Sequence, residues 1–350
     1  MPSAPRLVAE WEPQAGALVA WPHADTDWRR LLDKVEPVYV NLTAAIARYE
    51  TVMVCCRDHA HRDHVESLIS GHLSTPDRVV FATTPFNDTW IRDYGPLSVA
   101  RNGARELLKF AFNGWGKRFD AALDNQVAAC LQRQHVFGHT PMTVIDDWVL
   151  EGGSIDTDGD GTVLTTASCL TATNRNVTGD RHHIERRLQR AVGAQRILWL
   201  THGFLAGDDT DGHIDNLVRF CDASTLCHVM CRDESDEHFA PLRAMAEQLR
   251  SFRRPDGGYY RLIPLPLPRP IRNERGHRLP ASYANFLIIN GAVVVPVFND
   301  PADEVAMATL RPCFPGRDLV AIDARPLIQQ AGGIHCAALQ VSAGIPLLGA

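Results

Sequence analysis

Short apolar runs alternate along the chain with longer segments of helical periodicity. Six runs have the composition of strands, being rich in Val, Ile, Leu and Thr: TVMVCC at 51–56, RVVFAT at 78–83, TVLTTAS at 162–168, RILWL at 196–200, LVRF at 217–220 and VVVPVF at 293–298. Apolar residues spaced three and four apart predict helices at 31–49, 181–192, 236–250 and 301–313. The pattern predicts a mixed α/β fold.

No composition shift divides the chain. The fourth helix has a start signal, with Asp300 as cap and Pro301 at the first helical position. The proline-rich run PLPLPRP at 264–270 is interpreted as a surface loop rather than a linker. The sequence has no fixed repeat period, so any internal symmetry would be structural only. We expect one domain over residues 1–350.

Composition narrows the class of partner. With 350 residues and 45% hydrophobic content, the chain can bury a large core. A net charge of -6 does not attract nucleic acid or acidic membranes, and a small cationic molecule suits it better. The start of the chain lacks a signal-peptide pattern, and no apolar run approaches the roughly 20 residues of a membrane span. The sequence therefore predicts a cytoplasmic protein.

The nine cysteines include one with an unusual setting. Their odd number and the expected compartment predict reduced thiols, and no C-x-x-C pair starts a zinc site. Most lie in apolar runs and are interpreted as buried filler. Cys336 differs, because Gly332 and Gly333 precede it and His335 adjoins it. We expect an accessible thiol there.

Common cofactor motifs are missing from the sequence. There is no dinucleotide or P-loop glycine pattern, no G-x-S-x-G and no H-E-x-x-H. DTDGDGT at 156–162 copies the opening of a calcium loop, but the twelfth position, which needs a bidentate Glu, is Ala167. A turn between two strands explains this segment better. We expect no metal and no cofactor.

Four polar clusters carry candidate chemistry: NDTWIRDYGP at 87–96, LEGGSID at 150–156, DDTDGHIDN at 208–216 and AGGIHC at 331–336. Together they supply a thiol, a histidine, several carboxylates and an aromatic wall. This set suits attack on a guanidinium, whose planar cation needs a strong nucleophile held in register. Cys336 is the candidate nucleophile.

The other roles follow from the same chemistry. Asp93 and Asp215 are candidates to bind the guanidinium N–H groups through paired charge-assisted hydrogen bonds. His213 would protonate the leaving nitrogen and then activate water, and Glu151 would orient it. His213 lies two residues from Asp215, which places both on one face if the segment is extended.

The clusters also resemble a known family. W-x-R-D-x-G-P at 90–96, E-G-G-S at 151–154, D-T-D-G-H-I-D-N at 209–216 and G-G-I-H-C at 332–336 are similar to motifs of the agmatine deiminase and bacterial peptidylarginine-deiminase-like family. EWEPQ at 10–14, FNGWG at 112–116, LTTASCLTATNRN at 164–176 and YANFLIING at 283–291 agree. The similarity runs almost end to end.

The resemblance implies a fold and an activity. The family folds as a pentein, an α/β propeller of five blades with pseudo-fivefold symmetry, with its site in the central channel and no metal requirement. Cys336 would form an amidino-cysteine intermediate, His213 and Glu151 would act as acid/base and its partner, and Asp93 and Asp215 would bind the guanidinium. Trp90 would wall the substrate stem. Agmatine is the expected substrate, N-carbamoylputrescine the product, polyamine synthesis the context and a homodimer the expected assembly.

Departures from the family pattern concern the far end of the substrate. The chain has AGGIHC where agmatine deiminases often have GGNIHC, and its segment after FNGWG is shorter. Asn113, Trp115 and Asp211 are candidates for the channel mouth. Peptidylarginine or another alkylguanidine is the first alternative substrate. An amidinotransferase and a non-catalytic binding scaffold are further alternatives, whereas a calcium-regulated deiminase would need acidic sites beyond DTDGDGT.

Overall fold

The structure, a computed structural model, describes residues 5–350. The strands of these residues form five separate sheets. Two sheets have four strands: β1 (Arg6–Leu7), β5 (Leu97–Arg101), β6 (Ala104–Ala111) and β7 (Met142–Val149) in one, and β17 (Ala338–Ser342), β2 (Gln14–Ala20), β3 (Thr51–Cys56) and β4 (Val79–Thr83) in the other. Three sheets have three strands: β8 (Ile155–Thr157), β9 (Thr162–Thr166) and β10 (Arg196–Leu200); β11 (Val218–Asp222), β12 (Thr225–Val229) and β13 (Arg261–Leu265); β14 (Leu287–Ile289), β15 (Ala292–Val297) and β16 (Asp318–Asp323).

Every sheet repeats the same connection. An antiparallel pair is followed by a helical crossover to a strand that is parallel to the second member of the pair. In the fifth sheet the antiparallel pair joins the two ends of the chain, because β17 pairs with β2 before the crossover to β3. The repeat is therefore structural, as the missing sequence period predicts.

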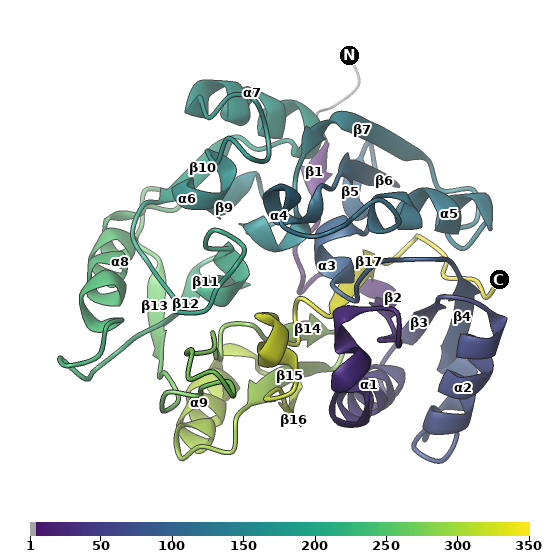
Figure 1. Cartoon of the computed structure of the whole chain (residues 1–350). Coiled ribbons are helices and arrows are strands. Elements are labelled where there is room, and N and C mark those ends of the chain that lie inside the picture. Colours follow the sequence, from purple (N-terminus) through teal and green to yellow (C-terminus); the bar gives the residue numbers. More distant parts are fainter. Residues whose placement is uncertain (1–4) are drawn as a thin grey trace.

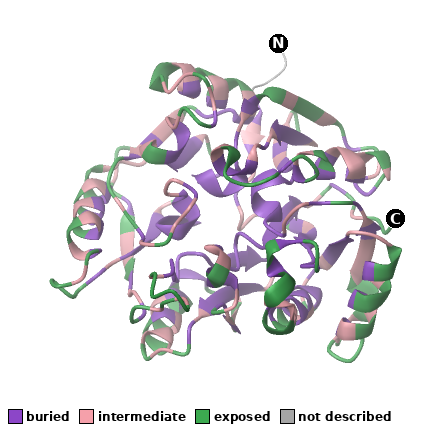
Figure 2. Cartoon of the chain, in the orientation of Figure 1, coloured by how far each residue is buried: buried purple, intermediate pink, exposed green. Residues whose placement is uncertain are grey.

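Helices occupy the crossovers and the segments that enter the sheets. The α-helices are α1 (Leu32–Ala47), α2 (His59–Ile69), α3 (Ile91–Tyr94), α4 (Gly114–Lys117), α5 (Val127–Arg133), α6 (Ala167–Leu170), α7 (Arg181–Val192), α8 (Phe239–Ser251) and α9 (Ala302–Leu310). The 3₁₀ turns are η1 (Asp27–Arg30), η2 (Pro76–Arg78), η3 (Asp124–Gln126), η4 (Gly152–Ser154), η5 (Ile214–Asn216), η6 (Arg311–Cys313) and η7 (Leu327–Gln330). The long helices lie at the periphery (Figure 1), and Figure 2 shows their exposed faces turned outward while the strands are mostly buried.

Helix α7 illustrates how the sequence defines an element. Asp180 caps it by accepting hydrogen bonds from the backbone N–H groups of His182 and His183, both at 3.2 Å. Gly193 ends it in the left-handed conformation, with φ of 71°. Ile184 and Leu188 lie four residues apart on the buried face, so burial of this stripe holds the helix against the sheet.

Most predicted elements are confirmed. The predicted strands at 51–56 and 196–200 and the predicted helix at 181–192 have the bounds of β3, β10 and α7. The turn predicted within 156–162 joins β8 to β9, where Asp158 accepts hydrogen bonds from the N–H groups of Asp160 and Thr162. In residues 5–350, no helix combines the length and apolar composition needed to cross a bilayer.

Two predictions need correction. The loop predicted at 264–270 starts later, because Pro264 and Leu265 belong to β13. A proline is tolerated there since β13 is an edge strand with one unpaired side. The helix predicted at 301–313 ends as α9 at Leu310, and Pro312 follows in a 3₁₀ turn because its ring cannot continue an α-helix.

Candidate active site

Five short polar segments meet at one place, and each directly precedes the strand that starts a repeat of the fold. They carry Asp93 in α3 before β5, Gly153 in η4 before β8, Asp215 in η5 before β11, Asn285 before β14 and Cys336 before β17. Hydrogen bonds join them across the chain, from Gly153 to Asp93 and between Asn285 and Cys336. The repeated connection therefore brings residues from all parts of the chain to one site.

Cys336 is buried and surrounded by polar groups. Its Sγ lies 3.2 Å from Nδ2 of Asn285 and 3.5 Å from Oδ2 of Asp215. Burial, and then the carboxylates of Asp215 and Asp93, raise the pKa of the Cys336 thiol well above its ordinary value. Cys336 is 7% exposed and lines a cavity. Although the residue is buried, the cavity leads to its thiol, for which the sequence predicts access.

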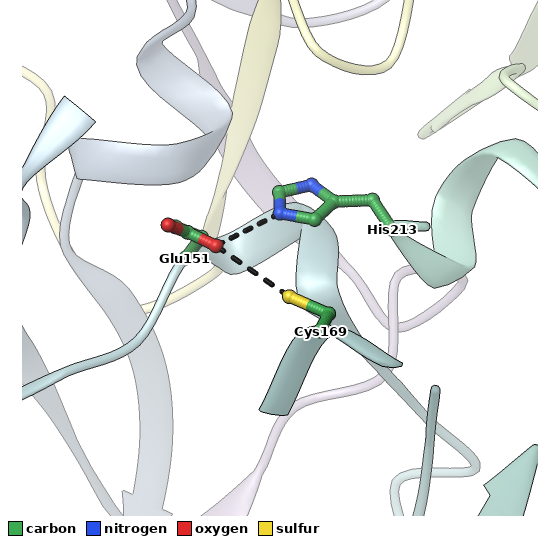
Figure 3. A group of neighbouring side chains, drawn as sticks. All are labelled: Glu151, Cys169 and His213. Carbon is green, nitrogen blue, oxygen red and sulfur yellow. Dashed lines mark hydrogen bonds and ion pairs between the residues drawn. The ribbon is translucent and has the colours of Figure 1, made fainter. Parts of the chain in front are cut away.

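His213 and Glu151 form a buried pair. Nε2 of His213 lies 2.9 Å from Oε2 of Glu151 (Figure 3). Nε of Arg175 donates to both oxygens of that carboxylate at 3.1 and 3.3 Å. Burial lowers the pKa of His213, but Asp93, Cys169 and Glu151 outweigh it and raise this pKa well above its ordinary value. These neighbours favour the protonated imidazole, and Nδ1 of His213 is directed toward Asp93.

Asp93 is fixed by two donors. Nε1 of Trp115 and the backbone N–H of Gly153 each donate to its carboxylate at 2.8 Å. Nδ1 of His213 lies 3.7 Å from Oδ1 of Asp93. Burial is the largest influence on the Asp93 carboxyl and raises its pKa, although His213 opposes this shift. A cation in the cavity would stabilise the ionised form.

Asp215 has one engaged oxygen and one free oxygen. Nδ1 of His335 lies 2.8 Å from Oδ2 of Asp215. The buried Oδ1 has no hydrogen-bond partner in residues 5–350. Burial raises the Asp215 pKa, but the hydrogen bond and charge of His335 outweigh it and lower this pKa from its ordinary value. Oδ2 is the oxygen that lies beside the thiol, and the buried Oδ1 is an open acceptor on the same carboxylate.

Gly153 lies where three functional side chains converge. A Cβ added to it would be 2.7 Å from Nδ1 of His213, 2.8 Å from Oδ1 of Asp93 and 3.0 Å from Oδ2 of Asp215. Only glycine leaves room for these groups at this spacing. An extended segment would place His213 and Asp215 on one face, but residues 214–216 form η5, and packing around Gly153 brings the two side chains together instead.

A cavity of about 360 Å³ leads to Cys336. Trp90, Trp115 and Phe119 supply aromatic walls, so both tryptophans that the sequence singles out line this cavity. Carboxylates of Asp27, Asp88 and Asp209 also line it. Burial, together with neighbouring aspartates, raises the pKa of Asp88 to about 7 and of Asp209 to about 6. The cavity therefore suits a cation with an apolar stem.

Asn113 and Asp211 do not line this cavity in the described part of the chain. Asn113 instead caps α4, where its Oδ1 accepts from the Gly116 N–H at 2.9 Å. Asp211 is neutralised by ion pairs with Arg118 and Arg175. Their predicted contact with substrate receives no support from the geometry, because local hydrogen bonds already engage both side chains.

One set of donors has a composition that a metal could use. Glu151, Cys169 and His213 bring an oxygen, a sulfur and a nitrogen within 4.8 Å of one another (Figure 3). Oε2 of Glu151 already lies within hydrogen-bonding distance of both partners, at 2.9 Å from His213 and 3.7 Å from Cys169. Arg175 also contacts this carboxylate, so we interpret the set as support for His213.

Sequence reasoning missed Asn285 and Arg175 as site residues. Both lie within motifs quoted for the resemblance, YANFLIING and LTTASCLTATNRN. The signal for Asn285 is its position, because it precedes an apolar strand as the four predicted clusters do. Arg175 has no comparable signal, since its contact with Glu151 depends on the tertiary fold.

Comparison with known proteins agrees with this geometry. The model of the Porphyromonas-type peptidyl-arginine deiminase family matches residues 6–342. A Legionella pneumophila protein named "Putative agmatine deiminase" is 33% identical over 337 residues, covering 94% of this chain and 92% of that protein.

Two solved structures are similar over almost the whole chain. A C. jejuni agmatine deiminase with substrate bound has a TM-score of 0.89 and 34% identity, and covers 97% of each chain. A structure named "Putative Arginine Deiminase from Porphyromonas gingivalis" has a TM-score of 0.91 and 43% identity, and covers 97% of this chain and 99% of the other. The chain therefore belongs to the Porphyromonas-type peptidyl-arginine deiminase family.

Proposed function

We propose that this protein is an agmatine deiminase, which hydrolyses agmatine to N-carbamoylputrescine and ammonia. The observation that carries the proposal is the position of Cys336, whose Sγ lies 3.5 Å from Asp215 at the end of a cavity lined by aromatic rings and carboxylates. A guanidinium cation fits beside Asp93 and Asp215, and its central carbon can then face the sulfur.

The first half of the reaction forms a covalent intermediate. The guanidinium lowers the pKa of the Cys336 thiol by its charge, the thiol releases its proton to solvent, and the resulting thiolate attacks the central carbon. His213, held by Glu151, donates its proton to the departing nitrogen, which leaves as ammonia. The sulfur then carries a thiouronium group.

The second half uses water in place of ammonia. His213, now neutral, takes a proton from the water that attacks the same carbon. Cleavage of the carbon–sulfur bond, with loss of the remaining hydroxyl proton to solvent, releases the ureido product and returns Cys336 as a thiolate. Asp93 and Asp215 accept hydrogen bonds from the substrate nitrogens throughout both steps.

The cavity mouth supports agmatine as the substrate. Agmatine has an ammonium group about four methylenes from its guanidinium, and Asp27, Asp88 and Asp209 can bind that charge. Trp90 and Trp115 can cover the methylene stem. Arg278 also lines the cavity, but Asp236 and Glu237 already pair with it at 2.8 and 3.4 Å.

Arginine or peptidylarginine is the second candidate substrate. The position of Arg278 and His277 in the cavity lining favours this candidate, since a cationic side chain there suits a substrate carboxylate. The family description and the P. gingivalis relative carry arginine in their names. An alkylguanidine with another tail would use the same guanidinium site.

The test compares three substrates without added metal. We would incubate purified protein with agmatine, free arginine and a peptide ending in arginine, and measure ammonia and ureido product. Strong turnover of agmatine is the expected result. Turnover of arginine or the peptide alone would overturn the substrate assignment, transfer of the amidino group to an added amine would favour an amidinotransferase, and no reaction on any of them would favour a binding scaffold.

Wider assignments accompany this proposal. The repeat of one connection in five sheets supports the five-bladed pentein propeller as one domain over residues 1–350. The nine free thiols support a reducing, cytoplasmic compartment. The homodimer and the polyamine context rest on the family resemblance, and sedimentation of the purified protein tests the dimer.

A further inference from the structure

His335, the residue before the nucleophile, lies between two buried carboxylates. Its Nδ1 is 2.8 Å from Oδ2 of Asp215, and its Nε2 is 2.6 Å from Oε1 of Glu10. The imidazole is 2% exposed and therefore makes these contacts out of reach of bulk water. The His335 side chain has no role in the candidate chemistry of the four polar clusters or in the proposed reaction steps.

The neighbours of the His335 ring limit how its two nitrogens can form hydrogen bonds. An ionised carboxylate only accepts hydrogen bonds, so a ring nitrogen of His335 can bond to one only as a donor. Glu10 is ionised because Arg219, His335 and Arg92 together outweigh burial and hold its pKa well below its ordinary value. Both ring nitrogens of His335 therefore face carboxylate oxygens, an arrangement in which each nitrogen can donate a hydrogen bond.

The surroundings fix the ring in place. Glu10 also accepts hydrogen bonds from Arg219 at 2.6 Å and Gln340 at 2.9 Å. The backbone N–H of His335 donates to Oδ1 of Asn285 at 2.9 Å, and Nε of Arg92 donates to the His335 carbonyl at 3.2 Å. These contacts leave the imidazole no other position.

We propose that His335 is a positioning residue that fixes the carboxylate of Asp215 beside the nucleophile. By donating to Oδ2, it holds the oxygen that lies 3.5 Å from Sγ of Cys336, and Oδ1, which has no partner in residues 5–350, keeps its capacity to accept from a substrate N–H. This inference rests on the proposed guanidinium site and adds to it a residue that acts through Asp215.

A positioning role for His335 also gives a function to the EWEPQ motif at 10–14. Glu10 comes from the segment before β2, and Cys336 and His335 come from the segment before β17, which pairs with β2. Glu10 therefore links the start of the described chain through His335 to the substrate-binding carboxylate.

Two matched substitutions separate positioning from packing. The amide nitrogen of Asn takes the place of Nδ1 and that of Gln takes the place of Nε2, so His335→Asn keeps the donor to Asp215 and His335→Gln keeps the donor to Glu10. Both replace the ring with a neutral amide. His228, another buried histidine, provides the control pair His228→Asn and His228→Gln.

Agmatine affinity measured by calorimetry in a Cys336→Ser background is the first readout, and kcat/KM of the single variants is the second. We expect His335→Gln to lose about tenfold or more in affinity and kcat/KM relative to His335→Asn, since a hydrogen bond to a charged group is lost. The His228 pair should not differ.

Equal losses in both variants, a larger loss in the Asn variant, or wild-type binding in both would overturn the positioning role. If the variants do not fold, a neutron structure of the wild-type protein replaces them, and an unprotonated ring nitrogen on His335 would overturn the proposal. Failure of the wild-type protein to release ammonia from any guanidine would instead overturn the proposed function, so the two failures are distinguishable.

Discussion

At the scale of single residues, the surroundings of the proposed nucleophile and of the proposed acid both favour the protonated form. Burial and the neighbouring carboxylates raise the pKa of Cys336, while Asp93, Cys169 and Glu151 outweigh burial and raise that of His213. Both shifts favour a thiol and an imidazolium in the empty site, whereas attack would need the thiolate. A bound cation changes this balance, because its charge favours the thiolate.

The nucleophile prediction concerns Cys336. Cys336→Ser should lower kcat with agmatine by more than about 10³-fold, because a serine hydroxyl in this acidic, buried setting is not ionised. The fold should persist, since the two side chains differ little in size. Cys130→Ser, at a half-buried thiol next to Arg133, is the control and should keep wild-type kcat. Comparable turnover in both variants would refute the assignment.

The pH profile tests how the thiol loses its proton. Because substrate lowers the pKa of Cys336, the acid limb of kcat should lie at lower pH than the acid limb of kcat/KM, which reports the free enzyme. The sign follows from a raised thiol pKa in the empty site, where activity increases as pH rises. Steady-state rates with agmatine between pH 6 and 10 measure both limbs, and coincident limbs would contradict substrate-assisted ionisation.

At the scale of elements, short turns rather than long helices build the site. The η4 turn is the clearest case, since Gly153 allows His213, Asp93 and Asp215 to approach one point. Its backbone N–H also donates to Asp93, so the turn both orders a carboxylate and leaves space beside it.

The Gly153→Ala variant tests this turn. The φ angle of Gly153 is not in the left-handed region, so the added methyl acts by collision with His213 and Asp93 rather than by backbone strain. We expect kcat/KM to fall by about 10²-fold or more, since small misplacements of reacting groups have effects of this size. Gly71→Ala, where a Cβ meets nothing within 4 Å, is the matched control. Wild-type kinetics in Gly153→Ala would show that the crowding is not functional.

Elements with strong local signals were predictable from the sequence, and those defined by tertiary contacts were not. β3 and α7 have apolar patterns and caps that match their bounds. β7 was not predicted, because its MTVIDDWV pattern is half exposed and polar. At the site, Cys336, His213, Asp93 and Asp215 converge as predicted, whereas Asn285 and His335 gain their contacts only when distant segments meet.

At the scale of the whole molecule, the pairing of β17 with β2 closes the chain around the site. Cys336 precedes β17 and Glu10 precedes β2, so this closure brings both ends of the described chain to the same buried network. Folding and assembly of the site are therefore coupled, and the free energy of unfolding depends on the charges buried near the center.

Asp124 has a buried carboxyl whose ionisation affects the stability of the whole chain. Its Oδ1 accepts hydrogen bonds from the backbone N–H groups of Asn87 at 2.7 Å and Asp88 at 3.1 Å, which ties η3 to the segment before α3. Its buried Oδ2 has no partner in residues 5–350. Burial, and to a smaller extent the charge of Asp88, raises the Asp124 pKa to about 8 from an ordinary value of 3.8.

The raised pKa fixes the sign of the pH dependence. The protonated carboxyl stabilises the fold fully below the ordinary pKa, and this contribution is lost as pH rises through about 8. Asp124→Asn cannot ionise, so its stability relative to wild type should increase from pH 5 to pH 9 by at least about 1 kcal/mol, or about 2 °C in Tm. Asp63→Asn, at an exposed aspartate in α2, should follow the wild-type curve. Parallel Tm curves for wild type and Asp124→Asn would mean that the buried carboxyl stays ionised and that Oδ2 finds a donor in solution.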